Sequence, residues 1–376
     1  MDSTSVRCSA GDPESPDRAV AGVGRLIDAR AGAEALILSA SDIERLRAAI
    51  GGRLLNVCFG GGVDSTAMLV ALKLADIRPD LTTFADTGGE KPETLAHVGA
   101  MDALLRSWGW PGVTVCRKVP LPSTSYTDLY GNCMANETLP SLAFGMKSCS
   151  IKWKQVPQDQ LLKGVKSGPN ASPPHPLWSG AQATGQRILK LIGYDCGRAD
   201  RRRAGSLSTG DSDFDYAYPL QLLGWERKDC IAAIASMLGP AHVPLKSACF
   251  FCPASKQWEL FWLAAHHPEQ LEKALFLERT ALTGKHSRFS AVEFGGNWED
   301  LVRSADKFPS STTTVGLGRS FAWNQWAKLN DVVNDDFSVK RGEADRERFT
   351  QRADQLRDPD NALDSRTTAS RSTANE

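Results

Sequence analysis

Three consecutive glycines between two apolar stretches constrain the fold of this chain more than any other feature. Residues 54–58 have the composition of a buried strand, and residues 67–74 have the apolar pattern of a helix. The glycines at 60–62 let the backbone turn sharply and approach a ligand closely. Ser65 and Thr66 then fall at the helix start, where free amides and the helix dipole favour an anion. The run predicts a phosphate or pyrophosphate site; the alternative is an ordinary glycine-rich turn.

A second strand, loop and helix follow in the same order. Residues 81–85 predict a strand, residues 93–108 a helix and residues 113–116 a third strand. Pro92 suits the first turn of the helix, and Glu93 suits its positive end. Such units pair their strands in parallel through right-handed crossovers, and ligands bind at the carboxyl ends of the strands. We therefore expect an α/β fold in which the two glycine-containing loops meet at one sheet edge.

These two loops resemble the motifs of the PP-loop ATP pyrophosphatase superfamily, in its branch similar to phosphoadenosine phosphosulfate (PAPS) reductases. The family's Ser-Gly-Gly-x-Asp-Ser stands as residues 60–65, with glycine in place of the opening serine, and its Asp-Thr-Gly-x-x-x-Pro-Glu-Thr stands as residues 86–94. The resemblance implies a parallel-sheet, adenine nucleotide alpha hydrolase-like domain that binds ATP, PAPS or adenosine phosphosulfate (APS) with Mg²⁺. It implies Asp64 and Ser65 as catalytic residues. The nucleotide-binding residues that it implies are Gly60, Gly61, Gly62, Asp64, Ser65, Thr66, Asp86, Thr87 and Gly88.

Clustered cysteines indicate metal or redox chemistry. Cys249 and Cys252 form a C-x-x-C pair, which suits a metal clip, a redox pair or two buried thiols. Residues 147–157 resemble the segment of iron–sulfur APS reductases that carries two adjacent cysteines. This chain keeps one of them, Cys149, and has Ser148 in the other position. In that family these cysteines combine with a later C-x-x-C to hold a 4Fe-4S cluster.

A cubane cluster held by cysteine alone needs four thiolates, so one ligand must come from elsewhere. Cys230 is the preferred fourth ligand because it lies on a predicted helix, residues 225–238, that leads towards the C-x-x-C; Cys133 and Cys196 are in reserve. The same four thiolates could hold zinc, three of them could bind a metal with a histidine, or no metal could bind. The resemblance favours iron–sulfur. The predicted metal ligands are Cys149, Cys230, Cys249 and Cys252.

A run of arginines follows a further predicted strand at residues 188–194. Arg198 in this run matches the Gly-x-Arg segment with which the resembling family contacts substrate sulfate or phosphate, and Arg202 matches it less well. The planar guanidinium group suits such bidentate contacts. The run could instead contact a nucleic-acid backbone or be a solvated loop. The predicted substrate-anion ligand is Arg198.

Two enzymatic reactions fit the resemblance. In the first, an acceptor attacks the α-phosphate of ATP and pyrophosphate leaves, as in similar enzymes of DNA phosphorothioation and tRNA thiolation; the acceptor would be a nucleic acid or a sulfur carrier. In the second, a cysteine attacks PAPS or APS. Resembling reductases use a C-terminal Glu-Cys-Gly-x-His nucleophile for this step, and no cysteine follows Cys252 here. The sequence therefore favours adenylation with sulfur transfer over sulfonucleotide reduction. A non-catalytic nucleotide-sensing subunit of a DNA-modification or defence system is the third alternative.

Composition excludes some classes of protein. The 376 residues can form one large domain or two, and 44 basic side chains balance 44 acidic ones, so overall charge indicates neither nucleic acid nor membrane. No stretch approaches the roughly 20 apolar residues of a membrane span. Residues 1–18 lack the apolar centre of a secretion signal. We expect a cytoplasmic protein, and the composition indicates no particular oligomeric state.

The chain divides into five predicted parts. They are a weakly ordered lead-in at 1–41, a nucleotide-binding core at 42–165, a Gly/Ser/Pro-rich loop at 166–187, the remainder of the core with the helical C-x-x-C region at 188–334, and a charged, partly disordered tail at 335–376. Helical patterns in the last two parts fall at 225–238, 255–266, 268–282 and 341–357.

Overall fold

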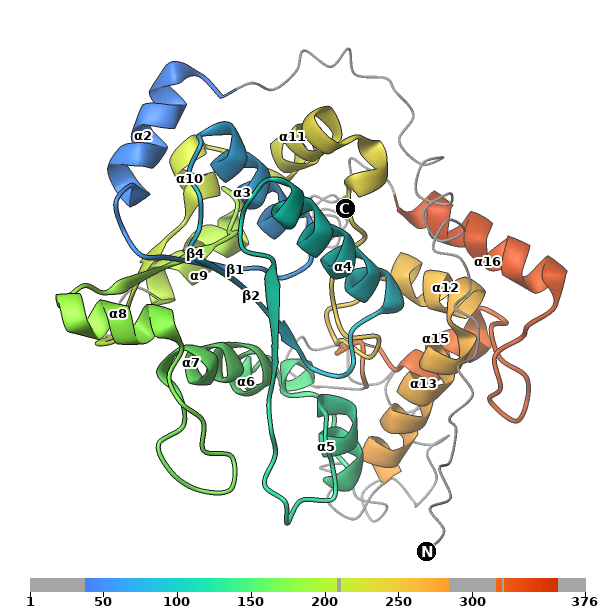
Figure 1. Cartoon of the computed structure of the whole chain (residues 1–376). Coiled ribbons are helices and arrows are strands. Elements are labelled where there is room, and N and C mark those ends of the chain that lie inside the picture. The colour runs from blue at the N-terminus through green and yellow to red at the C-terminus, as the bar shows by residue number, and fades with distance from the viewer. Residues whose placement is uncertain (1–37, 208–210, 284–315, 320, 358–376) are drawn as a thin grey trace, which may run out of the picture.

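The fold is built on one parallel sheet. The computed structural model describes residues 38–207, 211–283, 316–319 and 321–357. Its five strands lie in the order β3-β2-β1-β4-β5, with every neighbouring pair parallel and with helices on both faces (Figure 1). The predicted α/β class is confirmed. The strands are β1 (Leu55–Cys58), β2 (Leu81–Asp86), β3 (Val113–Arg117), β4 (Ile188–Ile192) and β5 (Phe214–Ala217).

The direction of the strand order reverses beside β1. The chain passes from β1 to β2 and β3 on one side, and later adds β4 and β5 on the other. Asn56 of β1 stands opposite Leu81 of β2 and Lys190 of β4, so β1 is paired along both edges. In open α/β sheets, ligands bind outside the carboxyl ends of the strands at such a reversal. The loops that follow β1 and β4 therefore flank the expected binding crevice.

One face of the sheet is covered by helices that share a large apolar core, here called the sheet core. α3 is apolar on nearly every side, as a helix enclosed by a sheet and other helices should be. α11 packs on α3, and α10 contacts both α3 and α2. The helices on this face are α2 (Ala40–Ile50), α3 (Val63–Leu74), α4 (Pro92–Ser107), α10 (Pro219–Leu223) and α11 (Arg227–Leu238).

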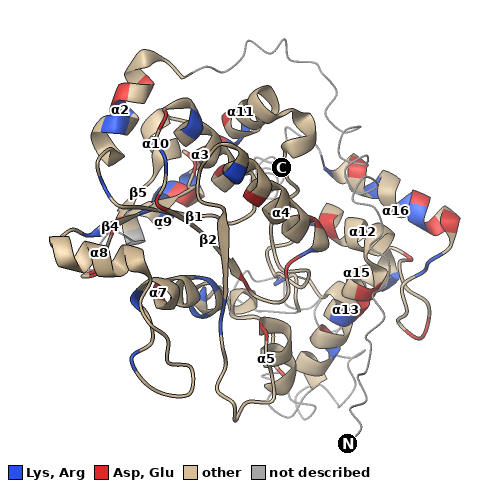
Figure 2. Ribbon diagram, viewed as in Figure 1, with Lys and Arg blue, Asp and Glu red and all other residues tan. Residues whose placement is uncertain are grey.

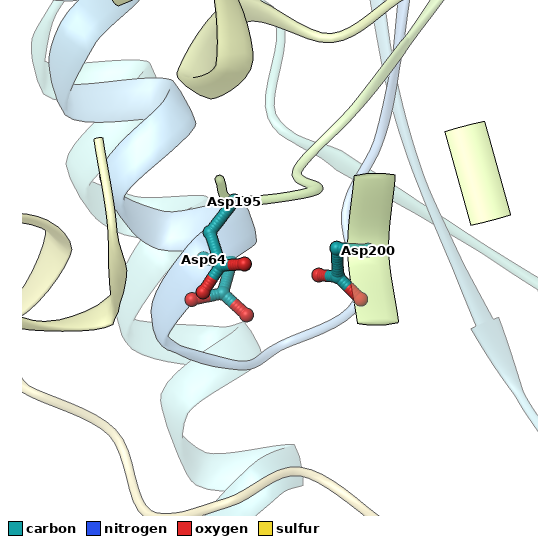
Figure 3. Close-up of side chains that lie close together, drawn as sticks. All are labelled: Asp64, Asp195 and Asp200. Carbon is teal, nitrogen blue, oxygen red and sulfur yellow. The ribbon is translucent and has the colours of Figure 1, made fainter. Parts of the chain in front are cut away.

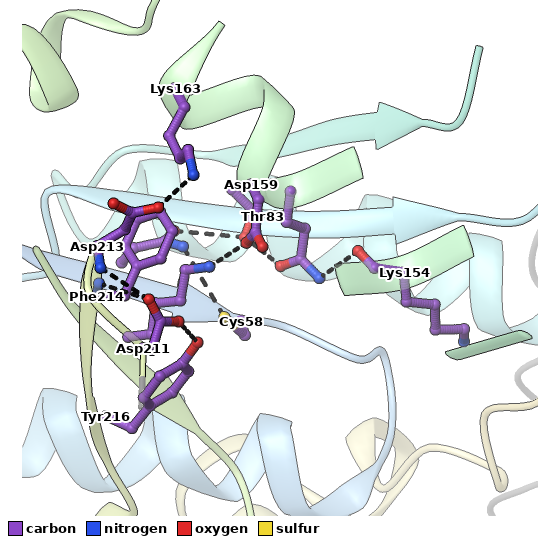
Figure 4. Close-up of polar contacts among 12 residues, drawn as sticks. Cys58, Thr83, Lys154, Asp159, Lys163, Asp211, Asp213, Phe214 and Tyr216 are labelled. Carbon is purple, nitrogen blue, oxygen red and sulfur yellow. Dashed lines mark hydrogen bonds and ion pairs between the residues drawn. The ribbon is translucent and has the colours of Figure 1, made fainter. Parts of the chain in front are cut away.

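Polar contacts hold α7 (Val156–Lys163) on the opposite face (Figure 4). Buried Lys190 of β4 forms an ion pair with Asp159 of α7, and its ammonium lies 3.5 Å from the centre of the Phe214 ring. Thr83 of β2 donates a hydrogen bond of 2.6 Å to Gln158 of the same helix. The central strands therefore carry partnered polar groups towards α7, whereas their other face is mainly apolar and includes the buried Thr82. α6 (Ser148–Ser150), the π-helix η2 (Ile151–Gln155) and α8 (Pro176–Thr184) lie on this side of the sheet.

A second apolar core, here called the helical core, carries the C-x-x-C segment. α12 packs closely against α16 and α13, and α13 packs against α5 and α15. The buried side chains of these helices form one continuous cluster with Phe250 and Phe251 of the C-x-x-C segment. The helices are α5 (Leu129–Ala135), α12 (Gln257–His266), α13 (Pro268–Thr283), α15 (Trp323–Leu329) and α16 (Glu343–Leu356).

Most predicted elements are confirmed, but two segments differ. The supposed loop at 166–187 contains α8, because the His175 ring accepts a hydrogen bond from the Leu177 amide at 3.1 Å and Pro176 starts the helix. The arginine run, for which a solvated loop was one alternative, forms helix α9 (Arg198–Leu207). The predicted tail at 358–376 and most of the lead-in lie outside the described residues. In the described segments, no helix combines the length and apolarity needed to cross a membrane.

A buried carboxylate joins α13 to α15. Glu278 is fully buried and accepts hydrogen bonds from the amides of Leu317 (2.5 Å), Trp323 (2.8 Å) and Asn324 (2.7 Å), and from the Asn324 side chain (2.7 Å). Burial raises the pKa of Glu278, although these donors oppose the rise. The carboxylate therefore caps the start of α15 from a neighbouring helix.

We predict that Glu278→Ala lowers the free energy of unfolding by about 2–4 kcal/mol, because several buried amides lose their acceptor. Urea denaturation followed by tryptophan fluorescence measures the change. Glu269→Ala is the control, since Glu269 lies exposed on the same helix and pairs only with Arg341. Equal midpoints for the two variants would contradict the role of Glu278.

Candidate functional site

The loop after β1 presents backbone amides at the start of α3. Gly61 has φ +68°, and a Cβ on it would lie 3.0–3.4 Å from side chains of β2 and α4, so glycine is required there. The Gly62 amide donates to the Ser65 hydroxyl at 3.3 Å. The first helical hydrogen bond runs from the Thr66 amide to the Gly62 carbonyl at 3.0 Å. The amides of residues 63–65 precede it and have no acceptor within the described chain, so they can bind an anion.

The side chains of Ser65 and Thr66 stabilise this loop. Both hydroxyls donate to the Gly62 carbonyl, at 3.1 and 2.9 Å. The Thr66 hydroxyl also lies 2.9 Å from Nε2 of His97, whose pKa is lowered by burial to about 4, so its imidazole is neutral near pH 7. The predicted residues are therefore in place, and the loop offers backbone amides rather than the Thr66 hydroxyl to a ligand.

The end of β4 touches the same loop. A Cβ on Gly193 would lie 2.8 Å from both the amide nitrogen and the Cα of Ser65. A larger residue would push the two backbones apart. This close approach brings residues 195–200 to the start of α3. Two segments far apart in the sequence therefore form one side of the crevice.

Three carboxylates gather where these segments meet (Figure 3). Asp64 of α3, Asp195 after β4 and Asp200 of α9 have oxygens within 4.8 Å of one another. Burial raises the pKa of Asp64, while the Arg227 guanidinium, 2.7 Å from Oδ1, opposes the rise. Burial also raises the pKa of Asp200. Carboxylate oxygens are preferred ligands of Mg²⁺, so this cluster could hold the cation that accompanies a nucleotide.

The loop after β2 is shaped by its own polar groups. Asp86 accepts a hydrogen bond of 2.7 Å from the Gly88 amide and forms an ion pair with Arg117 of β3. Gly88 has φ +76°, which favours glycine. The buried Thr87 hydroxyl donates to Glu90 at 3.1 Å. The predicted nucleotide residues Asp86, Thr87 and Gly88 thus lie together at the sheet edge, and the first two already bond within the protein.

The C-x-x-C segment runs across both glycine-containing loops. Glu90 and Cys249 form an antiparallel bridge, and the Cys249 thiol lies 3.2 Å from the Thr87 hydroxyl. At the other loop, a Cβ on Gly62 would lie 2.6 Å from the Ser247 hydroxyl. The thiol-bearing segment is therefore seated directly on the predicted nucleotide loops.

Buried Glu90 also brings a cation to the thiols. Lys154, in the turn after α6, lies 3.0 Å from Glu90 Oε1. Burial by itself would lower the pKa of Lys154, but Glu90 and, less strongly, Cys249 and Cys252 raise it. The ammonium therefore stays charged beside the C-x-x-C. The other oxygen of Glu90 is buried and has no hydrogen-bond partner among the described residues.

Four thiols share the helical core: Cys133, Cys149, Cys249 and Cys252. Burial, helped by the charge of Cys149, raises the pKa of Cys133 to about 12 and also raises that of Cys252. Cys249 and Cys252 are one turn apart, with the Cys252 amide 3.0 Å from the Cys249 carbonyl. Cys133 and Cys149 both line a cavity of about 350 Å³. Three of the predicted ligands thus lie in one neighbourhood with Cys133.

The structure places Cys230, the predicted fourth ligand, apart from the other predicted ligands. Cys230 is fully buried in the sheet core, on α11, where its charged neighbours include Asp64 and Asp195. α11 packs on α3, and the chain must then cross to the helical core before it reaches the C-x-x-C. Cys196 lies away from the helical core as well, with its thiol 3.9 Å from carbonyls of α10. Of the two reserve candidates, Cys133 is the one that the fold places in the helical core with the other three thiols.

The donor set suits a group larger than a single ion. Thiolates select zinc or iron–sulfur clusters, and a tetrahedral zinc ion would hold its four sulfurs about 3.8 Å apart. Among the described residues, the only group of three or more potential ligand atoms within 4.8 Å of one another is the aspartate cluster. The thiols are therefore spaced more widely than a closed zinc site requires. A cubane cluster would place its own iron and sulfide between four thiolates.

Arg198 is exposed at the start of α9 and belongs to none of the ion pairs among the described residues. Two other arginines pair with the aspartate cluster: Arg227, at the start of α11, pairs with Asp64, and Arg203 of α9 pairs with Asp200. The contact between Arg227 and Asp64 could not be predicted from the sequence because it joins residues 163 positions apart. Its one local signal is a cation in the first turn of a predicted helix, where the dipole disfavours positive charge.

Glu93 of the second motif has a structural role. Its Oε1 accepts hydrogen bonds from Trp262 Nε1 and interacts with His267 Nε2, each at 2.7 Å. Burial alone would raise the pKa of Glu93, but the bond to His267, its charge and the bond to Trp262 lower it to about 2. The carboxylate thereby ties α4 to the helical core.

The site combines three chemical features at one sheet edge: free helix-start amides, a carboxylate cluster and a group of buried thiols. Neither a scan against protein-family models nor a search of curated proteins found a match to this chain. The amides and carboxylates can bind a polyphosphate with its cation. The thiols can bind a soft metal group beside it.

We predict that Glu93 makes unfolding pH-dependent in acid. Its pKa is about 2 when folded and near 4.5 otherwise, so its contribution is complete above pH 4.5 and is lost as the pH falls towards 2. The loss is at most about 3 kcal/mol. Urea denaturation of the parent and of Glu93→Gln between these pH values measures it. An identical pH slope in the two proteins would contradict the assignment, and Glu269→Gln should keep the parental slope.

Proposed function

We propose that this chain is a PP-loop enzyme, similar to PAPS reductases, that binds ATP and adenylates an acceptor with release of pyrophosphate during sulfur transfer. One observation carries the proposal: the C-x-x-C segment is seated on the same loops that offer free amides to an anion. Phosphate binding and sulfur chemistry therefore share one crevice. The aspartate cluster beside the loop supports a magnesium-bound nucleotide.

In the proposed reaction, an oxygen of the acceptor attacks the α-phosphorus of ATP, the bond to the β-phosphate breaks, and pyrophosphate leaves. The amides of residues 63–65 would bind the departing pyrophosphate, whose charge develops as the bond breaks. Asp64, Asp195 and Asp200 would hold Mg²⁺, and Arg227 would orient Asp64. A sulfur nucleophile then replaces the activated oxygen, and AMP leaves.

A cluster bound by Cys133, Cys149, Cys249 and Cys252 would supply the sulfur nucleophile for this reaction. Lys154 would keep a positive charge beside it. Burial raises the pKa of Cys133, Cys249 and Cys252, so cluster binding would release protons from these thiols.

Gly60, which stands in place of the opening serine of the motif, has room for a side chain. A Cβ on Gly60 would meet only the Ser65 hydroxyl, at 3.7 Å. The missing hydroxyl is therefore not excluded by crowding. The loop retains its backbone amides, which supports pyrophosphate binding without that serine.

Sulfonucleotide reduction is the second candidate, favoured by the thiols beside the nucleotide loops. It requires a cysteine that attacks the sulfate sulfur, and no cysteine follows Cys252. Release of sulfite from APS or PAPS with a dithiol reductant would replace the first proposal with this one. Binding of ATP without pyrophosphate exchange would favour a nucleotide-sensing subunit.

We predict that Asp64→Asn slows exchange of labelled pyrophosphate into ATP by about a hundredfold, because the transition state loses an electrostatic contact. The assay contains Mg²⁺ and mixed single-stranded and duplex oligonucleotides as acceptors. Asp213→Asn is the matched control, since this aspartate forms a surface ion pair with Lys163 away from the loop. If the Asp64→Asn variant exchanged pyrophosphate into ATP at the rate of the parent protein, the assignment of the loop would be refuted.

We predict that Cys133→Ala lowers the iron and acid-labile sulfide bound per chain after anaerobic purification, whereas Cys230→Ala does not. Both cysteines are buried, but only Cys133 shares the helical core with Cys149. Metal analysis and visible absorption give the measurement independently of activity. Loss of iron in Cys230→Ala with retention in Cys133→Ala would reverse the ligand assignment, and colourless protein with stoichiometric zinc would exclude the cluster.

A further inference from the structure

Helix α9 presents three arginines on one face. Arg198, Arg201 and Arg202 have the i, i+3, i+4 spacing that places side chains side by side on a helix, and all three are exposed. The opposite side of the helix carries the buried residues Asp200 and Ala204. These three arginines are here called the arginine face. Figure 2 shows basic residues along α9.

The orientation of α9 is fixed by its buried side. Arg203 pairs with Asp200 at 2.8 Å and lies 5.7 Å from the Tyr194 ring centre. Tyr194 stacks on Tyr218 with ring centres 5.6 Å apart, and the Tyr218 hydroxyl donates to the Ala204 carbonyl at 3.1 Å. The Arg203–Asp200 ion pair and the hydrogen bond from Tyr218 to Ala204 therefore fix the orientation of α9. None of the ion pairs among the described residues involves the arginine face.

The arginine face begins at the mouth of the candidate site. Asp200, on the same helix, is a member of the aspartate cluster. The Cys196 amide donates to the Trp225 carbonyl at 2.8 Å, which brings the start of α11 alongside. Lys228 on that helix is highly exposed and lies 3.9 Å from the Glu226 carboxylate. An acceptor molecule bound along α9 would therefore extend towards the start of α3.

We propose that the arginine face binds the phosphate backbone of a nucleic acid, which is the acceptor of the reaction; this inference rests on the proposed function. The chain has no net charge, and the three arginines of this face have no ion-pair partner among the described residues, so they form a local group of positive charge. They span about 6 Å along the helix, which suits neighbouring phosphates of a strand. A mononucleotide would be bound by the loop before α3, whereas these side chains face outwards and complement an extended polyanion.

The test is binding of fluorescently labelled single-stranded DNA, duplex DNA and RNA of roughly 20 nucleotides to the full chain between about 50 and 200 mM salt. The variant R201Q/R202Q leaves Arg198 and the nucleotide loop intact. Its logarithmic salt slope should be smaller by about 1.4–1.8, and its Kd should be about tenfold higher or more.

Two further variants separate charge from folding. R346Q/R352Q removes two exposed arginines from α16 and should bind like the parent. Gly205→Glu retains every arginine but adds a negative charge to the same face, at a position with open space for a side chain, and should weaken binding. Equal slopes for R201Q/R202Q and the parent would overturn the inference. The inference would also be overturned if poly-glutamate competed as well as the oligonucleotides. That result would indicate an acidic protein partner.

Failure of this inference is distinguishable from failure of the proposed function. Oligonucleotide binding is measured without ATP, and pyrophosphate exchange can be measured with non-nucleic-acid acceptors. Exchange without arginine-dependent oligonucleotide binding would overturn only the docking surface. Arginine-dependent binding without exchange by any acceptor would overturn only the adenylation reaction.

Discussion

The buried carboxylate of Glu259 connects the two halves of the molecule on which the candidate site depends. It pairs at 2.6 Å with Lys91, at the start of α4, and at 2.7 Å with Lys246, just before the C-x-x-C. Burial would raise the pKa of Glu259, and the two lysines lower it. Because Lys91 and Glu259 are almost wholly enclosed, loss of either partner would leave an uncompensated charge in the interior. The thiol-bearing segment is thereby fixed to the loop that follows β2.

The glycines of the two loops therefore have two tasks. They allow the backbone to turn at the ends of β1 and β2, and they leave room for the C-x-x-C segment to approach. A Cβ on Gly89 would lie 2.6 Å from the Phe251 ring, as one on Gly62 would lie 2.6 Å from Ser247. Side chains at these positions would separate the helical core from the sheet. The closeness of thiols and anion-binding amides is a direct result of this packing.

Local patterns predicted most of the elements. β2, β3 and β4 were visible as short apolar runs, and α4, α11, α12 and α13 had clear helical spacing and favourable starts. β5 was missed because Phe214–Ala217 is short and partly polar at an edge of the sheet. α8 was missed because its prolines and glycine suggested a loop, whereas the His175 cap and the burial of Ala181 against the sheet stabilise a helix.

The sequence by itself determined the glycine loops, their place after strands, and the C-x-x-C, because each depends on residues within a few positions of one another. Only the tertiary structure decided which distant groups join them. It placed Cys133 rather than Cys230 with the other thiols, and it brought Arg227 to Asp64. The close contact of Gly193 with the start of α3 was likewise decided only by the tertiary structure. Such choices follow from how two cores pack on one sheet edge, and close approach between segments more than a hundred residues apart leaves no periodic signal in the chain.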